Sequence, residues 1–274
     1  MQFPMTDMVS PDEKFCLTTE GDANHLQGEW PNRYYTQVTR LELHYFRARK
    51  PARAQALVYG GGGYLELVYD KEGVEVALWL AEMGIDAYVV THRLPGAEDN
   101  SGGVYPADIA LQDGLACLDF IKGRSELPLL HVGLSSGGHL AGVMACQKNP
   151  LAAKGALIAY APINANHRKY KSPVGKPDYP PAEKQNFYDA WAIGIQNEPH
   201  AIPSVPVFLV YALHDQSVPV DHALNMIKTA QENGGDVEAH IYPQAPHGFA
   251  LRDTSGTHDQ WPHLAARWID NLLA

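Results

Sequence analysis

Leu130-His131-Val132-Gly133-Leu134-Ser135-Ser136-Gly137-Gly138-His139-Leu140-Ala141 is the stretch that decides the fold. Its first half is apolar and predicts a buried strand, whereas its second half is rich in small residues and predicts a helix. Ser135 stands between them in a GxSxG pattern. A strand, a tight turn and a helix in this order raise the serine hydroxyl above a sheet, where it can act as a nucleophile. Glycine is required at 133 and 137 because side chains there would collide with the neighbouring strand and helix.

The same pattern allows other interpretations, which the sequence argues against. Ser136 cannot be the centre of the motif, because position 134 is Leu where the motif needs Gly. A glycine-rich turn that binds phosphate at a helix N-terminus is the main alternative. Neither GxGxxG nor GK[ST] accompanies this turn, so a nucleophilic serine is favoured.

Strand-like and helix-like segments alternate along the chain on both sides of this motif. Short apolar or alternating runs predict strands at about 41–45, 54–59, 87–91, 129–133, 156–161, 207–212 and 238–242. Apolar periodicity predicts helices at about 71–83, 106–122, 137–148 and 219–233, and a terminal helix carrying Trp261, Leu264, Trp268 and Leu272. Such alternation predicts an α/β fold, with a mainly parallel central sheet and helices on both faces. The length of 274 residues suits a single domain over 1–274.

One segment, about 162–203, breaks this rhythm with Pro, Asn, Lys and Tyr and little periodicity. Long connections of this kind are usually functional or disordered. We expect an insertion that caps the carboxyl ends of the strands, where open α/β sheets bind ligands. Its Tyr188 and Trp191, and Tyr64 from an earlier loop, are candidate substrate contacts, although simple packing explains these aromatic residues equally well.

A run of glycines, Gly60 to Gly63, follows the strand expected at 54–59. Acyl transfer needs backbone N–H donors near the developing oxyanion, and glycine lets the backbone approach closely. The candidate donors are Gly62, Gly63 and Ser136, the residue after the nucleophile. A flexible strand-to-helix turn is the alternative interpretation.

Two late loops supply partners for the serine. Asp215 follows the strand expected at 207–212, and His247 lies in a Pro- and Gly-rich loop after the strand expected at 238–242. The order Ser, Asp, His is typical of hydrolases in which a histidine takes the serine proton and a carboxylate orients that histidine. Asp221 and His258 are rivals, but both fall on or beside predicted helices.

Taken together, these motifs resemble the HGGG-containing carboxylesterases, which include the hormone-sensitive-lipase-like enzymes and the small acetylxylan-esterase-like α/β-hydrolases. The resemblance covers the chain from about residue 50 to the C-terminus, including His92-Arg93-Leu94, Tyr105-Pro106-Ala107 and Asp113. It departs from the family at Gly60, where those enzymes usually carry a His, sometimes a Pro, that braces the glycine loop.

The resemblance implies an α/β-hydrolase that cleaves a small carboxylic ester through an acyl-enzyme, with a short acyl group such as acetyl on a carbohydrate. The same residues also suit an amide or formamide hydrolase. A non-catalytic binding protein of this fold is the third alternative, although such proteins typically lose Ser, Asp or His. No metal and no organic cofactor are implied.

Composition narrows the partners and the compartment. A formal charge of −10 argues against nucleic acid and anionic membranes as partners and leaves a small-molecule ester as the expected one. Three scattered cysteines predict free thiols in a cytoplasmic protein, and Met1 to Asp7 lack the features of a secretory signal. Self-association into a homo-oligomer stays open.

Overall fold

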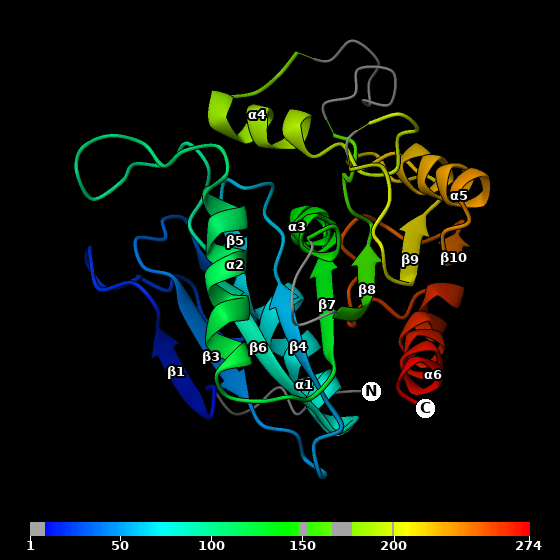
Figure 1. Ribbon diagram of the computed structural model, residues 1–274, viewed down its shortest axis with the longest axis horizontal. Coiled ribbons are helices and arrows are strands. Elements are labelled where there is room, and N and C mark those ends of the chain that lie inside the picture. Colours follow the sequence, from blue (N-terminus) through cyan, green and yellow to red (C-terminus); the bar gives the residue numbers. More distant parts are fainter. Residues whose placement is uncertain (1–8, 148–152, 166–176, 199) are drawn as a thin grey trace.

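The computed structural model describes residues 9–147, 153–165, 177–198 and 200–274. Within these ranges an eight-stranded sheet has the order β1-β3-β6-β4-β7-β8-β9-β10 (Figure 1). The strands from β6 to β10 run parallel, and β3 pairs antiparallel with both β1 and β6. The bounds in sheet order are β1 Glu13–Cys16, β3 Glu42–Phe46, β6 Ile85–Thr91, β4 Ala54–Tyr59, β7 Leu129–Leu134, β8 Ala153–Ala159, β9 Val207–Ala212 and β10 Val237–Tyr242.

Helices cover both faces of this sheet, and the strand residues alternate between the two resulting cores. Ala56 and Val58 of β4 belong to a core that includes residues of α1 and α6, whereas Leu57 and Tyr59 belong to one that includes residues of α2, α3 and α5. All four side chains are fully buried. The helices are α1 Glu75–Glu82, α2 Ile109–Lys122, α3 Ser136–Ala145, α4 Ala182–Ala190, α5 Asp221–Asn233 and α6 Trp261–Leu273, with a π-helical turn η1 at Asp70–Val74 and a 3₁₀ turn η3 at Thr257–Gln260.

The predicted fold class is confirmed by this sheet and its two helical layers. Element boundaries shift by a few residues from the sequence expectation. Strand β8 ends at Ala159, because Tyr160 turns out of the strand with a φ of 36°. The alternation expected around 41–45 also fails at His44, which is buried and bonded to the Tyr69 hydroxyl at 2.7 Å.

Several short elements escaped the sequence patterns. Strand β1 pairs antiparallel with β3 at one edge of the sheet, and a two-residue ladder joins β2 (Tyr34–Tyr35) to β5 (Leu67–Val68). Helix α4 arises within the segment expected to be an insertion, of which residues 166–176 and 199 lie outside the described residues. Figure 1 shows α4 beyond the arrowheads of β7 and β8. The boundaries of the predicted insertion stay a prediction.

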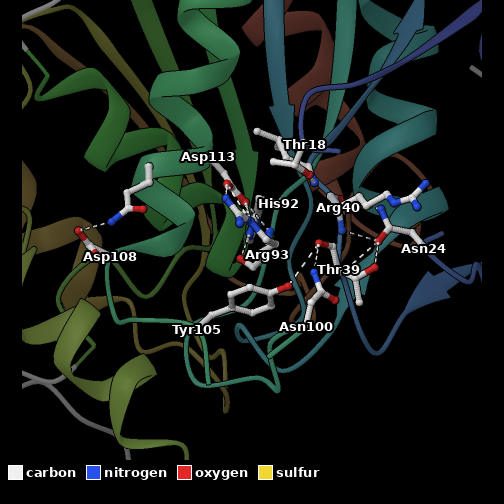
Figure 2. Close-up of polar contacts among 12 residues, drawn as sticks. Thr18, Asn24, Thr39, Arg40, His92, Arg93, Asn100, Tyr105, Asp108 and Asp113 are labelled. Carbon is white, nitrogen blue, oxygen red and sulfur yellow. Dashed lines mark hydrogen bonds and ion pairs between the residues drawn. The ribbon is translucent and has the colours of Figure 1, made fainter. Parts of the chain in front are cut away.

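The loop between β6 and α2 is fixed by a partly buried ion pair (Figure 2). Arg93 donates from its side chain and its backbone N–H to Asp113 of α2, whose carboxylate is fully buried. The guanidinium also lies 5.4 Å from the centroid of the Tyr105 ring. Tyr105 in turn donates to the carbonyl of Thr39 at 3.3 Å. Residues that carry the family resemblance are thus brought together as structural supports.

Membrane-spanning helices and metal-binding clusters are both absent from the described residues. None of their helices is both long enough and apolar enough to cross a membrane. None of their His, Cys, Asp and Glu side chains gather in threes suited to a metal ion.

Candidate active site

Ser135 occupies a strained turn between β7 and α3. Its φ of 52° and ψ of −128° lie outside the conformations that L-residues ordinarily adopt. The turn is held by the Ser135 N–H, which donates to the carbonyl of Ala159 at the end of β8. The serine is therefore fixed at the carboxyl end of the central strands, as the GxSxG pattern predicts.

The two motif glycines are required by close backbone packing. A Cβ on Gly133 would lie 2.1 Å from the carbonyl oxygen of Gly137, and a Cβ on Gly137 would lie 2.1 Å from that of Tyr59 in β4. Both separations are far below van der Waals contact, so neither position can accept a side chain without moving the backbone. The collision expected from the sequence is confirmed.

The structure brings the three predicted side chains into one hydrogen-bonded chain. Ser135 Oγ lies 3.3 Å from His247 Nε2, and His247 Nδ1 lies 2.7 Å from Asp215 Oδ2. Asp215 follows β9 and His247 follows β10, so parallel neighbouring strands deliver both to the same edge of the sheet.

Asp215 is anchored by its own loop. Its Oδ1 accepts the N–H groups of Ser217 at 2.8 Å and Val218 at 2.9 Å, which leaves Oδ2 for the histidine. Burial opposes ionisation of this carboxyl, but the bonds from His247 and the two N–H groups outweigh it and lower the pKa of Asp215. An ionised carboxylate only accepts hydrogen bonds, so His247 Nδ1 carries the proton and Nε2 presents its lone pair to Ser135.

The glycine loop lies next to the serine because β4 and β7 are adjacent and in register, Tyr59 opposite Gly133. Gly62 and Gly63 have φ values of 122° and 67°, which favour glycine. The Gly63 N–H donates to Ser136 Oγ at 2.8 Å. The backbone N–H groups of Gly62 and Ser136 have no acceptor among the described residues, so they are available to a bound carbonyl oxygen.

Position 60 has no room for the histidine that the resemblance leads one to expect. A Cβ on Gly60 would lie 2.7 Å from the carbonyl oxygen of Val68 in β5. The loop is instead braced from behind, where the Gly61 N–H donates to Glu72 Oε2 at 2.9 Å. The departure from the family pattern therefore follows from the path of the chain through β5.

The aromatic candidates lie on the α4 side of the loop. Tyr64 is 2% exposed, and its ring packs edge-on against Phe187 and Tyr188 of α4. Its hydroxyl lies 3.0 Å from His139 Nδ1, and His139 Nε2 bonds to the carbonyl of Trp191. The half-buried Trp191 stacks on His200 instead, with ring centroids 3.6 Å apart. As substrate contacts, Tyr64, Tyr188 and Trp191 stay predictions.

Sequence reasoning missed two residues of this site, Glu72 and Tyr160. Glu72 is 4% exposed in η1, and its Oε1 accepts the Tyr160 hydroxyl at 3.2 Å. The Tyr160 ring packs edge-on against the His247 imidazole, with centroids 5.3 Å apart. A signal for Glu72 was present, since positions 72, 76 and 80 are spaced by four and share one helical face with buried apolar residues.

Comparisons with known proteins place this geometry in a family. The model of the prolyl oligopeptidase family matches residues 118–274, a range that contains all three members of the Ser–His–Asp chain. A secreted triacylglycerol lipase, LIP1, from Malassezia furfur is 32% identical over 83 residues. That match covers 30% of this chain and 17% of the lipase, so it spans only a small part of this relative.

Solved structures share the fold over nearly the whole chain. An acetyl ester-xyloside bifunctional hydrolase from Caldicellulosiruptor lactoaceticus has a TM-score of 0.67 and 19% identity, over 97% of this chain and 98% of its own. A carboxylesterase, Cest-2923, from Lactobacillus plantarum WCFS1 has a TM-score of 0.64 and 16% identity, over 92% and 98%. A butyrate-bound thermophilic esterase from Thermogutta terrifontis has a TM-score of 0.61 and 17% identity, over 89% and 95%.

At these identities the structures establish the α/β-hydrolase fold, whereas the family model establishes the membership. The matched residues include Ser135, Asp215 and His247 together with the turn and the two loops in which they lie. All three lie at one edge of the sheet. The chain therefore belongs to the prolyl oligopeptidase family of serine hydrolases.

Proposed function

We propose that this protein hydrolyses small carboxylic esters through an acyl-enzyme formed on Ser135. The observation that carries the proposal is the continuous hydrogen-bonded chain from Ser135 Oγ through His247 to Asp215. Serine is a weak nucleophile at neutral pH, and an oriented imidazole that takes its proton overcomes this weakness.

In acylation, Ser135 Oγ attacks the ester carbonyl while its proton passes to His247 Nε2. Asp215 stabilises the imidazolium that forms. The oxyanion receives the N–H groups of Gly62 and Ser136, with Gly63 as a third donor once its N–H leaves the Ser136 hydroxyl. His247 then protonates the departing alkoxide, so that the alcohol leaves. Water, deprotonated by the same imidazole, then attacks the acyl-enzyme. The bond from the acyl carbon to Ser135 Oγ breaks, His247 returns the proton to that oxygen, and the carboxylic acid leaves.

A short acyl group is supported by the packing around the glycine loop. Tyr64 directly follows Gly63, and its buried ring packs against Phe187, Tyr188 and His139, so aromatic side chains occupy that side of the loop. The names of the structural neighbours agree with this size, since one is an acetyl ester hydrolase and another holds butyrate. An acetyl group on a carbohydrate is the substrate that we propose.

The family name favours a second candidate, hydrolysis of an amide or peptide bond by the same residues. A substrate panel separates the two. We expect kcat/KM to fall from p-nitrophenyl acetate to butyrate to octanoate, with an arylformamide and a prolyl p-nitroanilide far slower. A rate on either amide above that on the acetate would replace the ester proposal with the amide one.

Replacing the nucleophile tests the mechanism itself. Ser135→Ala should lower kcat on p-nitrophenyl acetate by roughly 10⁴–10⁶ and abolish labelling by a fluorophosphonate probe. Ser136→Ala is the matched control and should still be labelled. A Ser135→Ala protein that keeps more than about a tenth of the wild-type rate would remove Ser135 from its role.

We further propose that the protein works in the cytoplasm and binds neither nucleic acid nor membranes. Cys16, Cys117 and Cys146 are free thiols, as is typical of proteins in a reducing compartment. The formal charge of −10 disfavours polyanionic partners. Cell fractionation with an epitope-tagged chain tests the compartment, and gel filtration with light scattering tests whether the protein self-associates.

A further inference from the structure

Glu72 lies in the site, but the roles proposed for Ser135, His247 and Asp215 do not account for its position there. It lies in η1, directly behind the glycine loop, and its side chain is 4% exposed. Each of its carboxylate oxygens has a separate donor. The Gly61 N–H donates to Oε2 at 2.9 Å, and the Tyr160 hydroxyl donates to Oε1 at 3.2 Å. The carboxylate therefore links β4's glycine loop to the end of β8.

The same carboxylate faces the histidine loop. A Cβ on Gly248 would lie 3.2 Å from Lys71 Nζ and 3.8 Å from Glu72 Oε1, so the residue after His247 passes close to both side chains. Tyr160 bridges the remaining space, with its hydroxyl on Glu72 and its ring edge-on to the imidazole. Glu72 thus accepts a hydrogen bond from the glycine loop, and its charge acts on His247.

The charged groups near Glu72 come from η1 and from the loops after β9 and β10. Lys71 is its neighbour in η1, His247 interacts with it electrostatically, and Asp215 is bonded to Nδ1 of that His247. Burial raises the pKa of Glu72, whereas Lys71, His247 and the bonds from Gly61 and Tyr160 oppose that rise. The two donors on separate oxygens are the partners that an ionised carboxylate requires.

Glycine at position 60 explains why such a residue is needed. The family brace at that position is excluded by the Val68 carbonyl, and Gly61 to Gly63 have no side chains of their own to hold the loop. An oxyanion site works only if its N–H donors are fixed before the reaction. A buried acceptor behind Gly61 supplies that restraint.

We propose that Glu72 is a positioning residue that fixes the Gly61–Gly63 loop and, as a carboxylate, stabilises the protonated form of His247. This inference rests on the proposed serine hydrolase function. Its first role acts through Gly61 on the oxyanion donors. Its second adds another negative charge near the imidazole, besides that of Asp215, and stabilises the imidazolium that forms when Ser135 loses its proton.

Glu72→Gln is the decisive variant, because it keeps an acceptor of the same size and removes the charge. We expect kcat on p-nitrophenyl acetate to fall about 10- to 100-fold with KM changed less than about threefold. The acid limb of the kcat/KM profile should move to lower pH by about 0.5–1 unit, since loss of a nearby negative charge disfavours the imidazolium. An unchanged kcat together with an unmoved acid limb overturns the proposal.

Glu75→Gln is the matched control. Glu75 is also a buried carboxylate, one helical turn further on, but it binds Arg252 rather than the glycine loop. Its replacement should leave the acid limb in place. Glu72→Asp keeps the charge but shortens the reach to Gly61, so kcat should fall while the acid limb stays within about 0.2 unit of wild type.

The design remains decisive if Glu72→Gln does not fold. Glu72→Asp and Tyr160→Phe then carry the test, and wild-type kcat in both variants overturns the proposal. Failure of the underlying function has a different signature, namely a Ser135→Ala protein that stays active or a wild-type protein without an acid limb. A labelled, Ser135-dependent enzyme that is indifferent to Glu72 removes only this inference.

Discussion

At the scale of single residues, the site combines a strained nucleophile with partners that are anchored by their own backbones. Ser135 keeps an unfavourable φ of 52° because β8 accepts its N–H and the flanking glycines leave no alternative packing. Asp215 is held by two N–H groups of its own loop before it reaches His247. Strain at the serine is therefore supported by hydrogen bonds from neighbouring strands.

Replacing the orienting carboxylate should cost most of the activity. Asp215→Asn keeps the side-chain shape but no longer holds His247 in the tautomer that presents an unprotonated Nε2 to Ser135. We expect kcat on p-nitrophenyl acetate to fall by about 10³–10⁴ with the fold intact by circular dichroism. Asp221→Asn is the control, because Asp221 is exposed at the start of α5 and should be dispensable. Equal losses in both variants would contradict the assignment of Asp215.

At the scale of elements, adjacent parallel strands assemble the site. β4 carries the glycine loop and β7 carries the serine, and the two strands pair in register up to Tyr59 and Gly133. β9 and β10 do the same for the acid and the base. The first turn of helix α3 lies against the β4 backbone, where Gly137 faces the Tyr59 carbonyl oxygen.

A methyl group at position 137 should push α3 away from β4. Gly137→Ala places a Cβ 2.1 Å from the Tyr59 carbonyl oxygen, so we expect the free energy of unfolding to fall by about 1–3 kcal/mol or more. The activity should fall as well, because the glycine loop moves away from the serine. Urea unfolding monitored by tryptophan fluorescence measures the first effect.

Gly123→Ala is the matched control for this prediction. Gly123 caps the C-terminus of α2 with a φ of −74°. The atom nearest to a Cβ added there is the Phe120 carbonyl oxygen, 3.5 Å away. Alanine fits there without strain and should stabilise by about 0.4–1 kcal/mol. Similar unfolding midpoints for the two variants would contradict the prediction, because they would show that the contact between α3 and β4 tolerates an added methyl group.

At the scale of the whole molecule, several histidines are buried as neutral groups. Burial lowers the pKa of His131 and His222 to about 3 and that of His139 to about 4. Geometry supports this for His222, whose Nδ1 accepts the Asn164 backbone N–H at 3.1 Å and so carries no proton. Because these pKa values are depressed, the unfolded chain binds protons more readily than the native protein below about pH 6.5.

Stability should therefore be greatest above about pH 7 and decline as the pH falls from about 6.5 towards 4. Each such histidine contributes a loss of up to about 1.4 kcal/mol per pH unit. Urea midpoints measured at pH 8, 7, 6 and 5 give the slope. His222→Gln should reduce that slope, whereas replacement of the exposed His263 on α6 should not. A flat profile between pH 8 and 5 would refute the prediction.

Periodicity and motif together predict much of this molecule and fail for identifiable reasons. Buried runs such as 207–212 read clearly as strands because both faces of the sheet are covered, so every residue is apolar. Helix α4 was missed because only Phe187 and Tyr188 mark its buried face among charged and polar residues. Short strands such as β2 are defined by their partners rather than by their own residues.

For the site, the sequence indicates which residues could react but not what surrounds them. Ser135, Asp215 and His247 stand in recognisable local patterns, and the structure brings them within hydrogen-bonding distance. The helical spacing indicates that Glu72 is buried but not what it binds, since its role depends on contacts with Gly61 and Tyr160, which lie 11 and 88 residues away. Long-range contacts of this kind cannot be read from a single chain.

The bond from Gly63 N–H to Ser136 Oγ gives the resting protein an internal substitute for a water molecule. If Gly63 is an oxyanion donor, the carbonyl oxygen of a bound ester replaces Ser136 Oγ as the acceptor of its N–H. No water molecule then has to be removed from that N–H. The Ser136 hydroxyl thus keeps the Gly63 N–H in its orientation until the substrate carbonyl oxygen displaces it. Small anions that outcompete this hydroxyl would make the simplest inhibitors of the enzyme.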